Sequence, residues 1–557
     1  MQRPQGIFSI FRQNHGRPTS ISRFYWLTQS VGRSYHVSSR SCGVYLQIFA
    51  RTRSVNAGRL LHAIMVVNGV KQSSYLYSKL ILFYCQCGRI PDARKVFEKM
   101  PKRNLQSWVV LLGAYARYGY WQGTLELFDR MLEEGFAPNK YVFPSALRAC
   151  ANLSDLETGK RIHALVRNSG FDTDVFVDSA LVDMYAKCGC LESARRVFDM
   201  MSERDLVSWN TMVSSYSQCG MVEEALKLVR AMRSSGIKPD SVTWNAVIVG
   251  FSQMGNVVMA LMSFRDMQAD GIKPDIVSWT AMISGFAQNH LNEEAFGMFH
   301  RMLLSGFMPS SVTISGLLPA CANLENLKHG KEIHGYSLII GVAEEVFVSS
   351  SLVDVYAKCG FVSEARKVFD RMPKRNTVSW NSMIYGYAMH GHGIDALRLF
   401  YQMQSEGVIP DHITYTIVFT ACSHGGFVDQ GRAYFENMQL KHGIEPRMEH
   451  YAAIVDLLGR AGMLLEAYAF VNTMPMKPDF YVWGSLLGAC RIHGNVELAE
   501  IAASHLFELE PRGSGSYILL SNILAEAGRW RDAADIEKMM KNKKIKKKAG
   551  CSWVEAG

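Results

Sequence analysis

Asparagine and aspartate recur in pairs along this chain, and the two members of each pair are thirty positions apart. The pairs are Asn210 with Asp240, Asn245 with Asp275, and Asn381 with Asp411. An asparagine amide offers both donors and an acceptor, and a carboxylate accepts from N–H groups. Such a pair can hydrogen-bond to the polar edge of a planar ligand.

The residues around each pair predict two helices. In 241–275, apolar residues spaced at i, i+3, i+4 and i+7 form a stripe in each half. The stripes are Trp244, Val247, Ile248 and Phe251, and then Val257, Ala260, Leu261 and Phe264. Gly255 interrupts the pattern, and Gly271 with Pro274 ends the second helix.

The same pattern recurs in 206–240 and 276–310, so the chain is built from repeats. One hairpin of this size has too little apolar surface to fold alone, and neighbours must stack and share a core. The sequence therefore predicts an all-α solenoid of helix-turn-helix repeats. No apolar run reaches the length of about 18 residues that a membrane-spanning helix needs.

Three repeat types alternate. Short repeats of 31 residues lie at 74–104, 175–205 and 346–376. Long repeats with LxACANL and GKxIH lie at 140–174 and 311–345, and a degenerate one opens the array at about 39–73. Ordinary repeats lie at 105–139, 206–240, 241–275, 276–310 and 377–411, and the repeats 412–447 and 448–479 close the array.

The V-[ST]-W-N…G-I-K-P-D pattern resembles the pentatricopeptide repeat (PPR), and the long/short alternation resembles the PLS subclass of plant PPR proteins. WGSLLGACRIHGNVELAE at 483–500 resembles the first E motif of that subclass. YILLSNILAEAGRW and then GCSWVE at 550–555 resemble the second. The resemblance implies a right-handed α-solenoid superhelix. It also implies an array of about 13 repeats at 39–479 and E motifs at 480–513 and 514–555.

In this family, the fifth and last residues of a repeat read one base of single-stranded RNA. The pairs carried over are Ser78/Asn104, Ser179/Asp205, Asn210/Asp240, Asn245/Asp275, Thr280/Ser310, Ser350/Asn376 and Asn381/Asp411. They imply the word 5′-A-n-n-G-U-U-R-n-A-U-n-n, with three more bases before an edited cytidine. Second-position residues sandwich bases in the family, and here they are Phe176, Val207, Val242, Val277, Phe347, Val378 and Ile413. Lys187 and Lys358 are candidate phosphate contacts.

Each assignment has a structural alternative. An aspartate before a helix is an ordinary N-cap, but Thr243, Ser278, Ser208 and Ser379 are placed to cap, which would leave Asp240 and Asp275 available. Second-position residues could simply pack between helices, and the lysines could be solvated. The fourth-position tryptophans Trp209, Trp244, Trp279 and Trp380 are expected in the core and not as stacking platforms.

Charge is concentrated at the two ends of the chain. Residues 1–40 hold six arginines, seven serines and no acid, and residues 538–548 hold seven lysines and no acid. The first composition is typical of an organellar transit peptide, assigned to 1–38, with a disordered basic tail as the alternative. Arginine richness favours mitochondria over chloroplasts. The net charge of the chain is +10, and these two ends contribute +6 and +7, so the repeat array carries −3. General phosphate attraction therefore cannot be the main term if the array binds RNA.

Cysteines and histidines recur at fixed repeat positions, which indicates structural roles. Cys87, Cys188, Cys219 and Cys359 occupy position 14, and Cys150, Cys321, Cys422 and Cys490 occupy position 11. Both sets are expected to be small buried residues, without a metal site. His62, His163 and His334 occupy position 24 of long repeats, which indicates packing or capping. The sequence holds neither the H-x-E nor the C-x-x-C element of a zinc deaminase, so no enzyme activity and no cofactor are expected.

The leading hypothesis is a site-recognition factor for C-to-U editing of an organellar transcript. The E motifs would recruit a deaminase in trans, and the long repeats resemble docking surfaces for multiple-organellar-editing-factor proteins. The alternatives are an RNA stability, splicing or translation factor, or a protein–protein scaffold of helical repeats. The scaffold predicts no recurring polar residues at the fifth and last positions.

Overall fold

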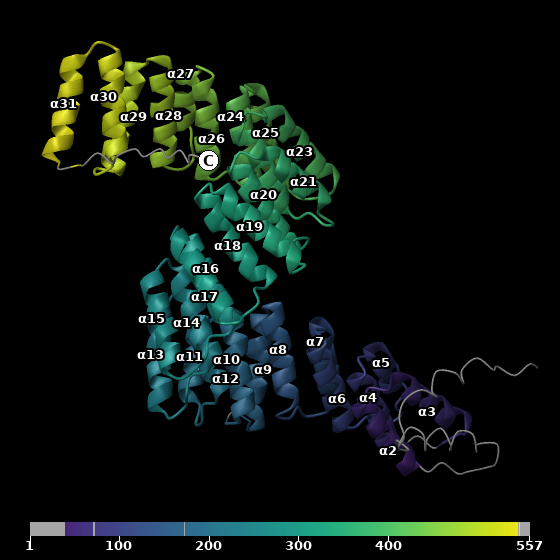
Figure 1. Cartoon of the computed structure of the whole chain (residues 1–557). Coiled ribbons are helices and arrows are strands. Elements are labelled where there is room, and N and C mark those ends of the chain that lie inside the picture. Colours follow the sequence, from purple (N-terminus) through teal and green to yellow (C-terminus); the bar gives the residue numbers. More distant parts are fainter. Residues whose placement is uncertain (1–38, 71–72, 172, 544, 546–557) are drawn as a thin grey trace, which may run out of the picture. The chain divides into compact units, whose positions relative to one another are not determined.

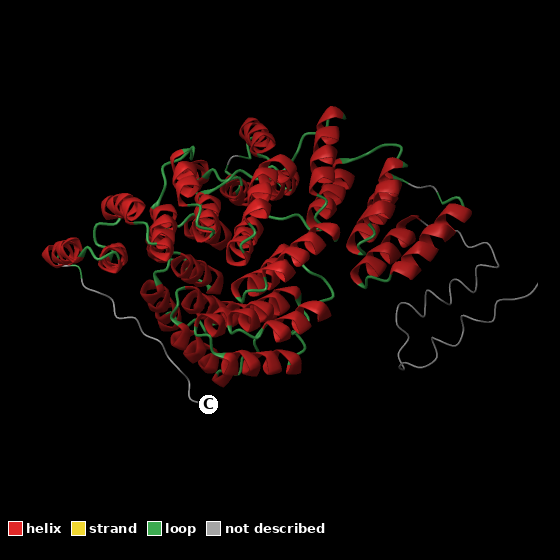
Figure 2. Ribbon diagram, turned by 90° about the horizontal axis from the view of Figure 1, so that it is seen from above, coloured by secondary structure: helices red, strands yellow, loops and turns green. Residues whose placement is uncertain are grey.

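The computed structural model describes residues 39–70, 73–171, 173–543 and 545. Across these ranges the chain forms thirty α-helices and no strand, which confirms the all-α prediction (Figure 2). The predicted targeting segment 1–38, the GCSWVE stretch at 550–555 and four of the seven C-terminal lysines lie outside the described residues. None of the helices in the described ranges combines the length and apolar character needed to cross a bilayer.

The helices fall into two compact parts, divided between Pro239 and Asp240. In the N-terminal part they are α2 (Ser39–Arg51), α3 (Val55–Val67), α4 (Ser74–Gln86), α5 (Ile90–Glu98), α6 (Leu105–Arg117), α7 (Trp121–Glu133), α8 (Val142–Leu153), α9 (Leu156–Ser169), α10 (Val175–Lys187), α11 (Leu191–Met200), α12 (Leu206–Gln218) and α13 (Val222–Ser234). Figure 1 labels them in chain order.

The C-terminal part continues the same series of hairpins. Its helices are α14 (Ser241–Gln253), α15 (Val257–Ala269), α16 (Ile276–Gln288), α17 (Asn292–Leu304), α18 (Ser311–Asn323), α19 (Leu327–Ile339), α20 (Val346–Lys358), α21 (Val362–Arg371), α22 (Thr377–Met389), α23 (Gly393–Ser405), α24 (His412–Gly425), α25 (Val428–His442), α26 (Met448–Arg460), α27 (Leu464–Asn472), α28 (Phe480–His493), α29 (Val496–Leu509), α30 (Ser514–Glu526) and α31 (Trp530–Asn542).

Within each part, the first helices of successive hairpins lie side by side in one continuous row. The rows run α2, α4, α6, α8, α10, α12 and α14, α16, α18, α20, α22, α24, α26, α28, α30. Except for the last hairpin of each part, each second helix packs on its own first helix and on the next first helix, for example α7 on α6 and α8. Gly386 allows the close approach of α22 to α20, because a Cβ there would lie 2.8 Å from Ala357 Cβ.

The core follows the predicted apolar stripes. Trp244, Val247, Ile248 and Phe251 are all at most 2% exposed, and the fourth-position tryptophans are buried as expected. Each of several tryptophans meets the edge of a phenylalanine from the preceding second helix. The ring centroids lie 5.1 Å apart for Phe264–Trp279 and 4.9 Å apart for Phe369–Trp380. These edge-to-face contacts join consecutive repeats.

The prediction that the regular cysteines are buried is confirmed at position 11 and is wrong at position 14. Cys150, Cys321, Cys422 and Cys490, at position 11, are fully buried. Cys87, Cys188 and Cys359 are partly exposed and Cys219 is exposed. The four cysteines at position 14 are the C-cap residues of α4, α10, α12 and α20, where the first helix ends at the surface of the hairpin.

Substituting Phe369 should destabilise the C-terminal part. Phe369→Ala removes a fully buried ring and its contact with Trp380, and a cavity of this kind costs about 3–5 kcal/mol. Urea unfolding followed by circular dichroism measures this loss. Phe347→Ala is the matched control, since Phe347 is 68% exposed and its loss should change the free energy of unfolding little. Equal effects of the two substitutions would contradict the assignment of Phe369 to the core.

Candidate nucleic-acid interface

At seven junctions between repeats, the last residue of one repeat caps the first helix of the next. Its side chain accepts a hydrogen bond from the backbone N–H three residues further on, with its own backbone extended. The capping residues with their helices are Asn104 (α6), Asp205 (α12), Asp240 (α14), Asp275 (α16), Ser310 (α18), Asn376 (α22) and Asp411 (α24).

The expectation that third-position hydroxyls cap these helices is therefore wrong. The backbone N–H groups of Ser208, Thr243, Ser278 and Ser379 are themselves the donors to the caps. A third-position residue already lies in the first helical turn, so only the residue before the helix can fold its side chain back over the free N–H groups. The Ser278 hydroxyl completes a capping box instead, since it accepts from the Asp275 N–H at 3.1 Å.

Two of the predicted asparagine–aspartate pairs meet in the C-terminal part. Asn245 Nδ2 donates to Asp275 Oδ1 at 3.2 Å and to Oδ2 at 3.4 Å, and Asn381 Nδ2 donates to Asp411 Oδ1 at 3.2 Å. The amide oxygens are held as well, because Ser278 Oγ donates to Asn245 Oδ1 at 2.6 Å and Thr414 Oγ1 donates to Asn381 Oδ1 at 2.7 Å. Sequence reasoning missed this role of the third-position hydroxyls, although their recurrence was visible.

The serine-containing pairs also meet, and two of their three contacts are longer than those of the asparagine–aspartate pairs. Ser179 Oγ donates to Asp205 Oδ1 at 3.0 Å, Ser78 Oγ lies 3.4 Å from Asn104 Oδ1, and Ser350 Oγ lies 3.5 Å from Asn376 Oδ1. In the described residues, Thr280 and Ser310 are joined only through Thr313, whose hydroxyl lies 2.7 Å and 3.1 Å from theirs. Asn210 and Asp240 belong to different parts of the chain, so their pairing stays a prediction.

Asp275 and Asp411 are held in the charged form, because the pKa of each is lowered. Burial acts to raise the pKa of Asp275, but hydrogen bonds from the Ser278 backbone, the Asn245 amide and the Ser278 hydroxyl outweigh it and lower the pKa. The pKa of Asp411 is lowered in the same way against its burial, by the Thr414 backbone and hydroxyl and by the Asn381 amide. A carboxylate in this state only accepts hydrogen bonds.

The second-position residues form an exposed apolar set next to these pairs. Phe176, Val207, Val242, Val277, Phe347, Val378 and Ile413 are each 50–72% exposed. Ordinary packing between helices does not account for side chains with this much exposure, since packed residues lose most of their accessible surface. Base sandwiching by these residues remains a prediction.

The two candidate phosphate-binding lysines already have partners. Lys187 Nζ lies 2.9 Å from Asp183 Oδ2, and Lys358 Nζ lies 2.8 Å from Asp354 Oδ2, one helical turn before each lysine. Both ion pairs are solvent-exposed and therefore weak. A phosphate contact would compete with an adjacent carboxylate, and the assignment stays a prediction.

The regular histidines lie on the second-helix side of the hairpins. Nδ1 of His62, His163 and His334 lies 2.8–2.9 Å from the hydroxyl of Tyr84, Tyr185 and Tyr356, respectively. These histidines thus join long repeats to short ones, which agrees with a packing role. They cap no helix, so the alternative expectation of capping is wrong. Burial lowers the pKa of all three, as do nearby cations: Lys99 for His62, Arg167 for His163 and Arg371 for His334.

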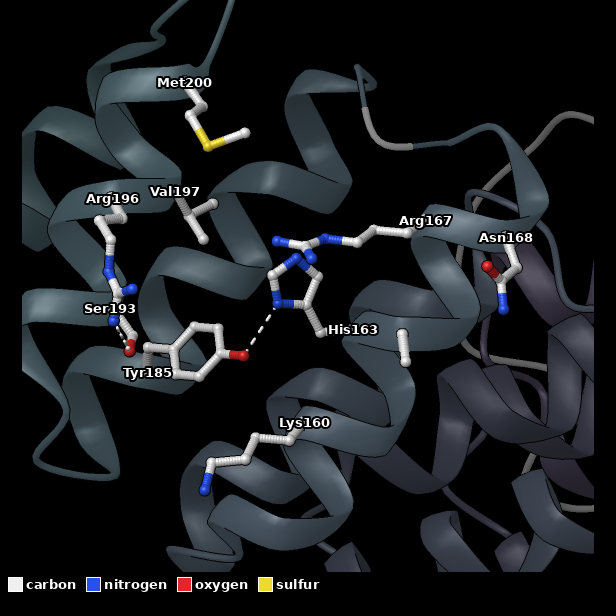
Figure 3. A pocket seen from close by; sticks show the side chains of 10 residues that line it. Lys160, His163, Arg167, Asn168, Tyr185, Ser193, Arg196, Val197 and Met200 are labelled. Atoms are coloured by element: carbon white, nitrogen blue, oxygen red, sulfur yellow. Dashed lines mark hydrogen bonds between the residues drawn. The ribbon is translucent and has the colours of Figure 1, made fainter.

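A cavity of about 530 Å³ lies beside the middle histidine–tyrosine bond (Figure 3). Residues of α9 and α11 line it, including Lys160, Arg167 and Arg196, together with Tyr185 of α10. Lys160 pairs with Glu157 at 2.8 Å, and Arg196 bonds to Ser193 at 3.3 Å. In the described ranges, no group of three or more potential ligands is placed to hold a metal ion.

Comparison with known families agrees with the hairpin series. The model described as PPR repeat matches 75–105, 106–136, 179–206, 347–377 and 413–442, and the PPR repeat family model matches 204–244, 239–288, 274–323 and 375–424. The E motif model matches 493–555. Pentatricopeptide repeat-containing protein At5g59600 of Arabidopsis thaliana is 55% identical over 92% of this chain and 97% of its own length. The chain belongs to the pentatricopeptide repeat family, and it carries an E motif.

Two further Arabidopsis pentatricopeptide repeat proteins show the range of the family. At3g57430, chloroplastic, is 36% identical over 90% of this chain and 50% of its own length. At3g53360, mitochondrial, is 35% identical over 92% of this chain and 71% of its own length. The solved structure of maize PPR10 covers 94% of this chain and 86% of its own, with a TM-score of 0.58 and 17% identity, which shows the shared fold.

Removing the Asp275 carboxylate should weaken the start of α16. Asp275→Ala deletes the cap and should cost about 1 kcal/mol of stability. Because its folded pKa lies below its ordinary value, the carboxylate stabilises the protein above that ordinary value. This contribution is lost as pH falls through the folded pKa.

Asp275→Asn should therefore flatten the fall in melting temperature between about pH 5 and pH 3, the range in which aspartates titrate. Thermal melts across this range measure the effect. Asp535→Asn, at an exposed residue of α31, is the control and should leave the profile unchanged. Identical profiles for wild type and Asp275→Asn would contradict the capping role of the charge.

Proposed function

We propose that this pentatricopeptide repeat protein binds one single-stranded organellar RNA by sequence and marks a cytidine in it for C-to-U editing. The observation that carries the proposal is the geometry at Asn381 and Asp411. Asp411 Oδ1 accepts from the Thr414 N–H and the Asn381 amide, and the Thr414 hydroxyl that donates to Asn381 lies 2.8 Å from it. Asp411 Oδ2 accepts none of the hydrogen bonds formed by the described residues. One carboxylate oxygen therefore serves the fold and the other is available to a base N–H.

Family membership supports an RNA ligand. A structure of maize PPR10 is titled as a complex with an 18-nt psaJ RNA element, and it covers 95% of this chain with a TM-score of 0.55. One helical repeat presenting a few side chains to one base is an established mode of single-stranded RNA recognition. The slightly acidic array favours such placed contacts over general phosphate attraction.

The E motif supports editing over RNA stabilisation, splicing or translation. We assign 39–479 to a PLS-type array, and 480–513 and 514–555 to two E motifs that recruit a deaminase in trans. Multiple-organellar-editing-factor proteins are the proposed accessory partners on the long repeats. On this assignment the chain itself is not the enzyme and needs no cofactor.

The proposed location is an organelle. Relatives named as mitochondrial and as chloroplastic support this class of compartment. The arginine-rich, acid-free composition of residues 1–40 favours the mitochondrion, with the chloroplast as the alternative.

Exchanging one pair for another should change the preferred base. Asn381→Ser with Asp411→Asn recreates the Ser350/Asn376 pair, so the chain should prefer A over U at that base of 5′-AnnGUURnAUnn. The loss of affinity for the original RNA should be about tenfold, equivalent to about 1–3 kcal/mol per base contact. Fluorescence anisotropy with both RNAs, and with a control RNA in which GUU and AU are scrambled, measures the change. Equal binding to all three RNAs would overturn base reading and favour a protein scaffold.

Loss of the protein should abolish editing at one site. RNA sequencing of organelles from a disrupted line of the source organism should show a cytidine, three bases after the matching word, that is no longer converted to uridine. Transcript ends, splicing and abundance should be unchanged at that locus. Altered ends, splicing or abundance with intact editing would instead establish the RNA-processing alternative.

A further inference from the structure

The repeat 412–447 carries a tyrosine where its neighbours carry a core tryptophan. Tyr415, at the fourth position of this repeat, is only 2% exposed. Its hydroxyl has no hydrogen-bond partner in the described residues, although other buried side chains of α24, such as Thr414, are hydrogen-bonded. The oxygen itself is not fully buried, so this hydroxyl is open to water or to a ligand.

Tyr415 lines an open cavity of about 210 Å³ between α23, α24 and α25. Five of its ten lining residues carry rings. Phe400 lies 5.7 Å from the Tyr415 ring and 5.5 Å from the Tyr434 ring, in edge-to-face arrangements, and His442 lies 6.0 Å from Tyr415. The walls therefore suit a flat apolar group.

The polar groups of this cavity favour an acceptor with negative charge. No carboxylate is among the lining residues, and Lys441, which is exposed at the cavity, forms no ion pair within the described ranges. The Tyr434 hydroxyl donates to the Tyr401 hydroxyl at 2.6 Å, which leaves the Tyr401 hydrogen free to donate. An aromatic box can also hold a cation, but among the described residues that line this cavity the charged one, Lys441, is itself basic.

The volume limits the ligand to about one ring. An apolar cavity of about 150 Å³ can hold benzene, and this cavity is slightly larger, with room for one substituent. A phosphate alone would leave the aromatic walls without contact. The lining residues include none of those proposed to read bases, so the site is separate from the RNA interface.

We propose that this cavity binds a small aromatic carboxylate. The ring lies against Phe400 and Tyr434, an oxygen of the ligand accepts from the Tyr415 hydroxyl, and the negative charge pairs with Lys441. The site requires no RNA and no partner protein, and it does not depend on the proposed function.

Isothermal titration of the full chain with sodium benzoate tests the proposal. Benzoate should bind with one site per chain, and Tyr415→Phe, which keeps the ring and removes only the hydroxyl, should weaken binding about tenfold, as expected for a hydrogen bond to a charged group. Lys441→Gln, at an exposed side chain, should weaken it by a similar factor. Tyr451→Phe is the matched control, because Tyr451 holds the same position in the next repeat and lies outside the cavity.

Further probes separate this ligand class from its competitors. Benzamide and inorganic phosphate should bind at least tenfold more weakly than benzoate, since each lacks either the charge or the ring. Tighter binding of tetramethylammonium would overturn the proposal in favour of a cation cage, and equal binding of phosphate would reduce it to an anion site. Absence of benzoate binding, or binding that Tyr415→Phe and Lys441→Gln leave unchanged, would also overturn it.

Discussion

The turn between two repeats depends on one hydrogen-bonded cap. The four N–H groups at the start of a helix have no partner inside it, and here the last residue of the preceding repeat provides one. In the C-terminal part, Asp275 and Asp411 do this while also accepting from Asn245 and Asn381 of the previous first helix. The same carboxylate therefore starts one helix and fixes its register against its neighbour.

The opposite ends of the first helices are joined by a comparable contact. His390 Nε2 donates to the Ala357 carbonyl oxygen at 2.7 Å, and Asn289 Nδ2 donates to the Ser252 carbonyl oxygen at 3.1 Å. In both cases a side chain at position 14 satisfies a carbonyl near the C-terminal end of the preceding first helix. With the caps at one end and these bonds at the other, neighbouring first helices have little freedom to slide. Such rigidity is what a series of base-reading positions needs, because a displacement of about one ångström would misalign donor and acceptor.

The sequence was sufficient for the hairpins because they depend on short-range periodicity. The stripe from Trp244 to Phe251 and the turn glycines predicted both helices of 241–275, and the structure follows them. The contacts between repeats were harder to predict. Position 14 recurs as regularly as position 11, yet it lies at a helix end, so periodicity alone could not distinguish the partly exposed Cys188 from the buried Cys150. Likewise, the sequence alone did not show whether the serine or threonine three residues after the cap caps the helix or bonds to other side chains. The position of the helix start decides this, because only the residue before the first turn can cap the free N–H groups.

Helix capping and base recognition are two possible roles of the aspartates, and the hydrogen-bond geometry allows one aspartate to perform both. A carboxylate has about four acceptor positions. Asp275 uses Oδ1 for the Ser278 N–H and the nearer Asn245 contact, with the Ser278 hydroxyl oxygen 3.0 Å away, while Oδ2 receives only the 3.4 Å contact. A serine at the last position has one oxygen for both tasks, and Ser310 already shares it with Thr313. A side chain that both caps a helix and hydrogen-bonds to a base therefore needs a second polar atom, which aspartate and asparagine have and serine lacks. This difference gives a physical reason to expect weaker base discrimination at the Thr280/Ser310 pair than at Asn245/Asp275.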